Sequence, residues 1–193
     1  MHYSRGGFSL QTTKNDNLVT KSIDFVTTSV VKLLRQQGSS VSTAESCTGG
    51  MLAQSITSVS GASEIFEMGV VSYSNRIKTM LLDVPEDVLE KYGAVSQQTA
   101  VLMAQGVMVK SGSDIGVGIT GIAGPTGGTE DKPVGTVYVA VVRNTNDEQR
   151  VLVKNLALYN EEKELTRDKI RQLTVLKALE MIALICEADE RNK

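Results

Sequence analysis

The sequence predicts a three-layer α/β/α fold with a mixed, mostly parallel sheet. Runs of helical periodicity alternate along the chain with short β-branched runs, and this alternation is typical of α/β domains. Of the 193 residues, 41% are hydrophobic and 22% are charged, which is an ordinary composition for one globular domain with a full core. Residues 1–19 are polar and rich in hydroxyl groups, so we expect a flexible tail there and a single domain over residues 20–193.

Boundary residues place the individual elements. Gly38 and Gly93 each follow a run with helical spacing and end it, whereas Pro85 and Ser96 stand where helices begin. Asn75 is expected to cap a further short helix. The predicted elements are, in order, a helix over residues 21–37, a strand over 41–44, a helix after Gly50, a strand over 69–74, helices over 76–82, 85–92 and 97–110, strands over 114–120, 135–142 and 150–158, and a helix over 161–187.

Composition and charge argue against several classes of function. A net charge of −2 and an aromatic content of 4% without tryptophan give no basis for nucleic-acid or membrane binding. The two cysteines form no disulfide framework and residues 1–19 contain no apolar signal segment, so we expect a cytoplasmic protein. The single histidine, His2, lies in the predicted tail. Histidine-based triads and zinc sites are therefore not expected, and an activated nucleophile would need a lysine, a carboxylate or a tyrosine as its base.

The turn around Ser46 is the first candidate for a functional site. It follows a strand and precedes a helix, so its hydroxyl would be exposed at the carboxyl end of the strand, beside backbone N–H groups that can hold an anion. Ser46 and Thr48 could equally serve only as helix caps. Cys47 is an alternative nucleophile, although a lone cysteine is more often a small buried hydrophobe. Lys78 lies in the first turn of a predicted helix, where a cation opposes the helix dipole, and either function or solvent screening would explain it.

Glycine-rich sequence follows the third predicted strand. The loop over residues 121–133 could line an anion-binding nest with its N–H groups, or it could be a simple connector. Residues 116–121 match the G-x-G-x-x-G dinucleotide fingerprint, which would favour an oxidoreductase. The context argues against that match, because the glycines lie within a strand and a proline-containing loop follows where a helix should begin. Ligands of α/β folds bind beyond the carboxyl ends of strands, so we expect this loop, the turn at Ser46 and residues 73–78 to converge.

Four sequence blocks resemble the CinA C-terminal-domain family. They are T-A-E-S-C-T-G-G at residues 43–50, G-V-V-S-Y-S-N-R-I-K at 69–78, G-A-V-S at 93–96, and G-I-T-G-I-A-G-P-T-G-G-T-E-D-K-P-V-G-T-V at 118–137. The blocks stand in the family's order and at about its spacing, and the resemblance covers residues 21–187. It implies a short, stand-alone nicotinamide-nucleotide amidohydrolase, which converts nicotinamide mononucleotide to nicotinate mononucleotide and ammonia.

The resemblance also implies a Ser–Lys mechanism. Ser46 would attack the carboxamide carbon, Lys78 would act as the base, and Tyr73 would relay or orient the proton. For this role the amine of Lys78 must be neutral near pH 7, so its pKa must lie well below the ordinary lysine value of about 10.4. This agrees with the base types to which the histidine count leads independently.

A wider set of binding residues follows from the same resemblance. The amides of residues 47–49 would form the oxyanion hole, and the loop over 121–128 with Thr48 would hold ribose and phosphate. The substrate would be a pyridine mononucleotide, no cofactor or metal ion is implied, and the expected assembly is a homo-oligomer. The substrate-binding residues implied are Glu45, Cys47, Thr48, Gly49, Thr120, Gly121, Ala123, Gly124 and Arg171.

One departure from the family pattern leaves a competing function open. The family usually carries a Gly-Asp-Arg-x-x-Val-Arg run before its last helix, and residues 165–171 here read L-T-R-D-K-I-R. The arginines are kept but the glycine and aspartate are not, which would alter the phosphate end of the site. The chain could thus be a weak or inactive paralogue that serves as a nucleotide-binding regulatory module. Retention of Ser46, Tyr73 and Lys78 favours the active amidase.

Overall fold

A five-stranded mixed sheet forms the centre of the computed structural model, which describes residues 14–145, 148–160 and 165–190. Its order is β2-β1-β3-β4-β5. β1 pairs in parallel with β2 and β3, while β4 pairs antiparallel with β3 and β5, so four of these strands run in one direction. The predicted mixed sheet is confirmed, although two of these pairings are parallel and two antiparallel, so the sheet is not mostly parallel. The strands are β1 (Val41–Glu45), β2 (Phe66–Val71), β3 (Ile115–Gly121), β4 (Val137–Asn144) and β5 (Gln149–Asn155).

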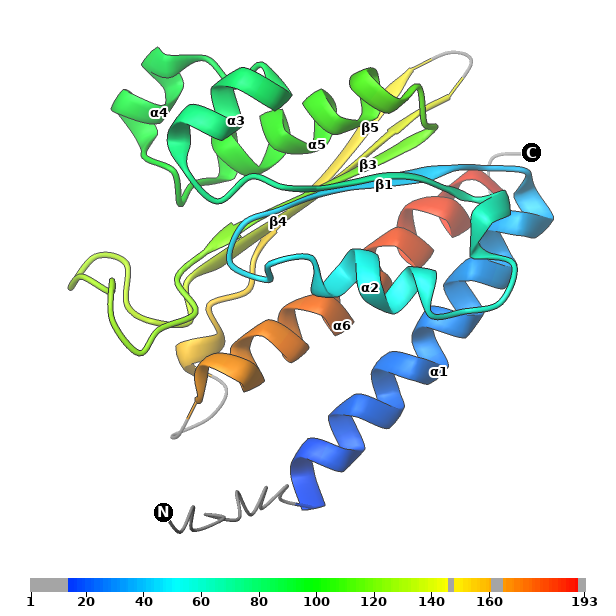
Figure 1. Cartoon of the computed structure of the whole chain (residues 1–193), viewed down its shortest axis with the longest axis horizontal. Coiled ribbons are helices and arrows are strands. Elements are labelled where there is room, and N and C mark those ends of the chain that lie inside the picture. The colour runs from blue at the N-terminus through cyan, green and yellow to red at the C-terminus, as the bar shows by residue number, and fades with distance from the viewer. Residues whose placement is uncertain (1–13, 146–147, 161–164, 191–193) are drawn as a thin grey trace, which may run out of the picture.

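Helices cover both faces of the sheet, as the three-layer prediction requires (Figure 1). On one face α5 packs on β1, β3 and β4, with α3 and α4 beside it. On the other face α6 packs against α1, α2 and β4. The helices are α1 (Lys14–Gln37), α2 (Met51–Thr57), α3 (Asn75–Leu82), α4 (Glu86–Tyr92), α5 (Gln97–Ser111) and α6 (Arg167–Glu190), and short 3-10 turns cover Ala62–Glu64 and Leu158–Asn160.

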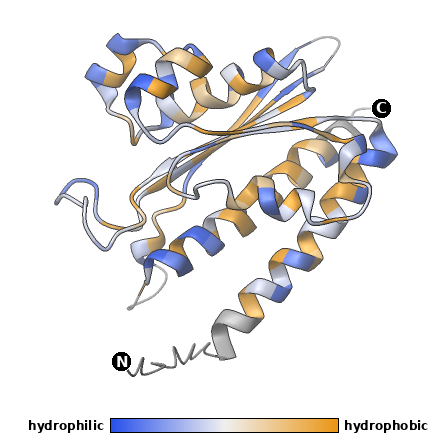
Figure 2. Cartoon of the chain, in the orientation of Figure 1, coloured by the Kyte–Doolittle hydropathy of each residue, from blue (hydrophilic) through white to orange (hydrophobic). Residues whose placement is uncertain are grey.

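Alternate residues of β3 pack against different helix layers. Val117 and Ile119 are fully buried in the larger apolar cluster, which includes residues of α1, α2 and α6. A Cβ atom at Gly116 or at Gly118 would overlap a backbone carbonyl oxygen of α5, so these glycines allow α5 to lie in backbone contact with β3. The glycines of the G-x-G-x-x-G match therefore serve helix–sheet packing, and α5 occupies the space beside them. Figure 2 shows apolar residues concentrated where the helices meet the sheet.

Two element boundaries that flank the site differ from the predicted ones. β2 ends at Val71 rather than at residue 74, because Ser72 N makes a last bond to β1 and the chain then turns toward α3. Ser74 rather than Asn75 caps α3, since its Oγ accepts a hydrogen bond from Ile77 N at 3.3 Å. Both residue types are good caps, and the position of the turn decides between them.

Differences at the chain's outer segments are larger. α1 begins at Lys14, so helix extends into the segment for which a tail is predicted, and residues 1–13 lie outside the described residues. β5 ends at Asn155 rather than at residue 158. The last predicted helix is helical from Arg167, while residues 161–164, at its predicted start, lie outside the described residues.

Candidate active site

Ser46 lies directly after β1, in the turn that leads to α2. Its amide bonds to the carbonyl oxygen of Ile119 in β3 at 3.0 Å, which holds the residue at the end of the sheet. Gly49 and Gly50 have φ values of 63° and 90°, a conformation that glycine adopts without strain. The tight turn therefore fixes the serine at the carboxyl edge of β1, where it is 9% exposed.

The carboxylate of Glu45 holds the turn from its other side. It accepts hydrogen bonds from the amides of Gly50 and Leu52, each at 3.1 Å, and of Ala53 at 2.8 Å. Amides at a helix start lack acceptors within the helix, and a negative charge is favourable there. Glu45 is 1% exposed and does not line the pocket beside Ser46. In this structure the Glu45 carboxylate therefore holds the turn and does not face the pocket, so the predicted substrate contact remains a prediction.

Lys78 reaches Ser46 from α3. Its Nζ lies 3.3 Å from Ser46 Oγ and donates to the carbonyl oxygen of Ser72 at 2.7 Å. The residue is 1% exposed. Burial lowers the pKa of Lys78 from its ordinary value of 10.5, against a weaker effect of Cys47 that raises it. The amine is therefore shifted toward its neutral form and lies within hydrogen-bond distance of a serine hydroxyl, from which it could accept a proton.

A pocket of about 250 Å³ opens over this pair. The loop after β3 forms one wall, and the segment between α4 and α5 forms another. Tyr73 is 63% exposed, and its phenol oxygen accepts a hydrogen bond from Arg167 at 3.2 Å. Arg167 also donates to the carbonyl oxygen of Gly124 at 2.7 Å, so a cation links two sides of the pocket. The predicted site residues that line it are Ser46, Cys47, Tyr73, Lys78, Thr120, Gly121, Ala123 and Gly124.

Three other predicted binding residues hold the turn and do not line the pocket. Arg171 donates from Nε and Nη2 to the carbonyl oxygen of Thr48 at 3.2 and 2.9 Å. The Gly49 amide donates to the carbonyl oxygen of Ser46 at 3.1 Å, so it is not available as an oxyanion donor. Of the three amides predicted to form the oxyanion hole, those of Cys47 and Thr48 have no backbone acceptor within the described part of the chain.

The two candidate nucleophiles, Ser46 and Cys47, differ in their surroundings. The side chain of Cys47 is 5% exposed, and burial raises the pKa of the Cys47 thiol to about 12. The thiolate is the nucleophilic form of cysteine, and a thiol with this pKa holds its proton at neutral pH. Ser46, with an amine beside its hydroxyl, has the better environment for nucleophilic attack.

Sequence reasoning missed three residues that line the pocket, namely Ala94, Val95 and Arg167. The signal for Arg167 is present in the altered run before the last helix. Thr166 Oγ1 accepts a hydrogen bond from Lys169 N at 3.2 Å, which is the capping role that an aspartate would fill there. The change from aspartate to threonine therefore leaves Arg167 at the helix start, facing the pocket.

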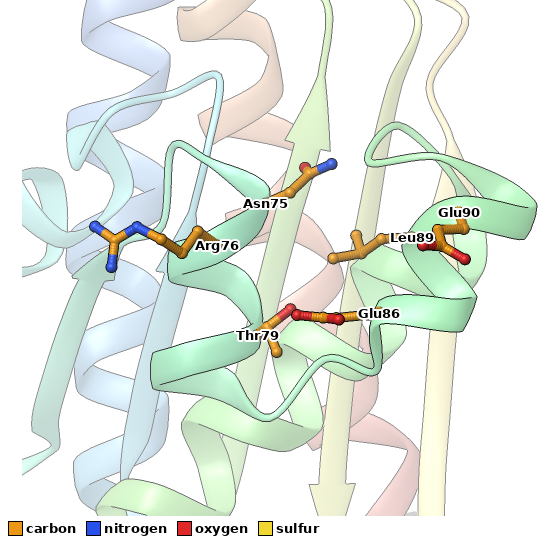
Figure 3. Close-up of a pocket in the computed structure, with 6 residues that line it drawn as sticks. All are labelled: Asn75, Arg76, Thr79, Glu86, Leu89 and Glu90. Carbon is orange, nitrogen blue, oxygen red and sulfur yellow. The ribbon is translucent and has the colours of Figure 1, made fainter.

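A second pocket, between α3 and α4, has a volume of about 340 Å³ (Figure 3). Its lining includes Asn75, Thr79, Glu86 and Leu89, but neither Ser46 nor Lys78. It brings together no nucleophile and buried base, so the pocket over Ser46 remains the candidate active site. Among the described residues, no group of three or more histidine, cysteine, aspartate or glutamate side chains could hold a metal ion.

Comparison with known proteins places the chain in a family. The model of the CinA C-terminal domain matches residues 23–186. A CinA-like protein of Cytophaga hutchinsonii is 48% identical over 153 residues, which are 79% of this chain and 34% of that protein. A CinA-like protein of Kosmotoga olearia is 46% identical over 153 residues, 79% of this chain and 35% of that protein. The chain thus spans about a third of the length of these relatives.

Solved structures agree with this placement. The competence/damage inducible protein CihA of Agrobacterium tumefaciens has a TM-score of 0.78 and 37% identity, covering 84% of this chain and 94% of that one. A competence-damaged protein (CinA) superfamily protein of Escherichia coli has a TM-score of 0.74 and 26% identity, covering 93% of this chain and 99% of that one. No helix among the described residues is long and apolar enough to cross a membrane. The chain belongs to the CinA C-terminal domain family.

Proposed function

We propose that this protein is a nicotinamide-nucleotide amidohydrolase that converts nicotinamide mononucleotide to nicotinate mononucleotide and ammonia. The observation that carries the proposal is the buried amine of Lys78 at 3.3 Å from the hydroxyl of Ser46, inside a pocket of about 250 Å³. In this arrangement a serine can be activated without histidine. The family relationship supports the same assignment, since the sequence blocks that carry the resemblance surround this pocket.

In the proposed reaction the neutral amine of Lys78 takes the hydroxyl proton as Ser46 Oγ attacks the carboxamide carbon. The oxyanion that forms is stabilised by the amides of Cys47 and Thr48, which have no other backbone acceptor in the described part of the chain. The Lys78 ammonium then gives its proton to the leaving nitrogen, and ammonia departs as the C–N bond breaks. Water, deprotonated by the same amine, attacks the acyl-serine ester. As the bond between the acyl carbon and Ser46 Oγ breaks, the Lys78 ammonium returns its proton to Ser46 Oγ, and nicotinate mononucleotide is released.

Lys78 is suited to both steps because its environment disfavours the ammonium. Its Nζ has one fixed acceptor, the Ser72 carbonyl oxygen, which keeps the amine oriented toward Ser46 while burial lowers its pKa. Among the described residues, Tyr73 makes no hydrogen bond to Ser46 or to Lys78. Its phenol bonds to Arg167 at the pocket mouth. In this proposal Tyr73 orients the substrate or relays a proton only after Arg167 has exchanged partners.

Arg167 is the group that best fits the substrate phosphate. It is a guanidinium at the N-terminus of α6 and lines the pocket, and both the charge and the helix end favour an anion. The loop that contributes Gly124 and Gly127 lies against the same pocket. The phosphate would replace the Tyr73 phenol and the Gly124 carbonyl as partner of Arg167.

The test is release of ammonia from nicotinamide mononucleotide by the intact protein and by Ser46→Ala and Lys78→Met. We expect release by the intact protein and a loss of at least about 10³-fold in kcat for either variant, because the two side chains act as one unit. Lys91→Met is the matched control, since Lys91 is an exposed lysine in the last turn of α4. Activity that survives Ser46→Ala would contradict the mechanism. A folded intact protein that releases no ammonia but binds the nucleotide would favour the nucleotide-binding regulatory module instead.

A further inference from the structure

The segment between α4 and α5 is held in place almost entirely by side chains. It includes Ala94 and Val95, which line the pocket, and it belongs to no helix or strand. Each successive carbonyl oxygen from Tyr92 to Val95 accepts a hydrogen bond from a side chain elsewhere. Thr120 Oγ1, for example, donates to the Ala94 oxygen at 2.7 Å. The position of this pocket wall therefore depends on those donors rather than on a backbone ladder.

Lys132 ties this wall to the loop between β3 and β4. Its Nζ donates to the carbonyl oxygen of Val95 at 2.8 Å and to that of Tyr92 at 3.2 Å. Lys132 belongs to the loop between β3 and β4, whose earlier residues line the other side of the pocket. Among the described residues, these are the hydrogen bonds that join this loop to the segment over 92–95. Tyr92 is also the last residue of α4, where a cation is favoured by the helix dipole.

The backbone on which Lys132 stands is itself fixed. Lys132 N donates to Thr129 Oγ1 at 3.1 Å, and Thr129 N donates to the Lys132 carbonyl oxygen at 2.9 Å. At the base of the loop, Gly135 N donates to the carbonyl oxygen of Ile122 at 2.8 Å, and Ile122 N donates to that of Thr136 at 2.9 Å. The loop is therefore closed at its base and at the turn that carries Lys132, so the ammonium acts from an anchored position.

We propose that Lys132 is a positioning residue that sets the separation of the two pocket walls, and so controls how tightly the substrate is held without taking part in the chemistry. The inference rests on the proposed function for its kinetic effect, but its structural effect is independent of it. Lys132 does not line the pocket, and among the described residues its ammonium bonds to carbonyl oxygens of the wall and not to Ser46 or Lys78. Its loss should therefore affect binding rather than the reaction of the bound substrate.

The experiment compares Lys132→Met, Lys132→Arg and the matched control Lys91→Met. Lys91 lies one residue before Tyr92, and its Nζ lies over the Tyr92 ring, 5.1 Å from the ring centre. For Lys132→Met we expect KM for nicotinamide mononucleotide to rise about tenfold with kcat within about twofold of the intact protein, which is the signature of lost uniform binding. Lys132→Arg, which keeps the donors, should have a KM close to that of the intact protein. Lys91→Met should change neither KM nor kcat.

Amide hydrogen exchange of the same proteins gives a readout that does not require activity. In Lys132→Met, exchange of the Gly93 amide, which donates to the carbonyl oxygen of Leu89 at 3.0 Å, should become at least about tenfold faster, while exchange in α5 and β3 stays unchanged. If the intact protein releases no ammonia, the proposed function fails and the exchange result alone judges the role of Lys132. Unchanged exchange of the Gly93 amide, or a loss confined to kcat, would overturn the inference. Faster exchange throughout the chain would also overturn it, because it would mark Lys132 as a general stabiliser.

Discussion

The Glu45→Gln substitution tests whether this carboxylate positions the turn that contains Ser46 or contacts the substrate. The Glu45 oxygens accept bonds from the amides of Gly50, Leu52 and Ala53. Glutamine keeps the shape but replaces one oxygen by an NH₂ group, which cannot accept. At least one amide then loses its acceptor, at about 1–3 kcal/mol, and the remaining bonds lose their charge at the helix start, at roughly 0.3–1 kcal/mol. Because the neutral amide is easier to bury, we expect a net loss of about 2–3 kcal/mol of unfolding free energy.

Urea unfolding of Glu45→Gln and of the intact protein measures this loss directly. Glu67→Gln is the matched control, because Glu67 is an exposed residue of β2, and we expect it to change stability by less than about 0.5 kcal/mol. Since the turn carries Ser46, kcat for amide hydrolysis should fall together with stability in Glu45→Gln, while KM changes little. A variant with unaltered stability and a raised KM would refute the reasoning and restore a direct substrate contact.

Three further predictions address the buried amine, the thiol and the helix–sheet contact. Folding lowers the pKa of Lys78, so at a pH between that pKa and 10.5 only the unfolded chain holds the proton. The free energy of unfolding should therefore rise with pH through that interval. Urea unfolding of Lys78→Met should show no such rise. Hydrolysis should increase with pH over the same lowered pKa, as a pH–rate profile would show. Cys47→Ala should keep kcat within about threefold, because the thiol stays protonated, and a larger loss would reinstate Cys47. Gly118→Ala should lower unfolding free energy by about 3 kcal/mol or more, since its methyl group meets the backbone of α5; a midpoint shift in urea measures it.

Much of the fold is visible in the sequence because local signals and tertiary contacts agree. Ser96, predicted as a cap, accepts a hydrogen bond from Thr99 N at 3.2 Å, and Gly93 follows α4 with a φ of 80°. The ends of β2 and the start of α3 are less predictable. Ser74 and Asn75 are both good caps, and only the course of the chain after β1 and β2 decides which of them takes the position.

The pairing of Ser46 with Lys78 was expected from the family resemblance, but the surroundings of the pair were not predictable from the sequence. Ser46 follows a strand and Lys78 opens a helix, and both signals survive in single-sequence patterns. By contrast, Glu45 and Arg171 are polar residues next to the site whose direction no pattern reveals. Each satisfies backbone groups of the turn: Glu45 the amides of α2, and Arg171 the carbonyl oxygen of Thr48. The same types of residue hold a site together and contact ligands, so only the direction of the side chain distinguishes the two roles.

The burial that lowers the pKa of Lys78 also destabilises the fold, because the amine is desolvated. Bonds from neighbouring elements offset part of this loss. An amine that is 1% exposed loses its hydration, which lowers its pKa and would destabilise the domain at neutral pH. The carbonyl oxygen of Ser72 compensates in part, with a bond of 2.7 Å from the turn where β2 ends. Because Ser72 N is in turn bonded to Glu45 O at 2.8 Å, the acceptor that orients the Lys78 amine is attached to the strand that leads into Ser46. Ser46 and Lys78 are therefore held by one continuous set of bonds across β1 and β2. A substitution that loosens the end of β1 or of β2 should change the distance between Ser46 and Lys78 before it disrupts the sheet.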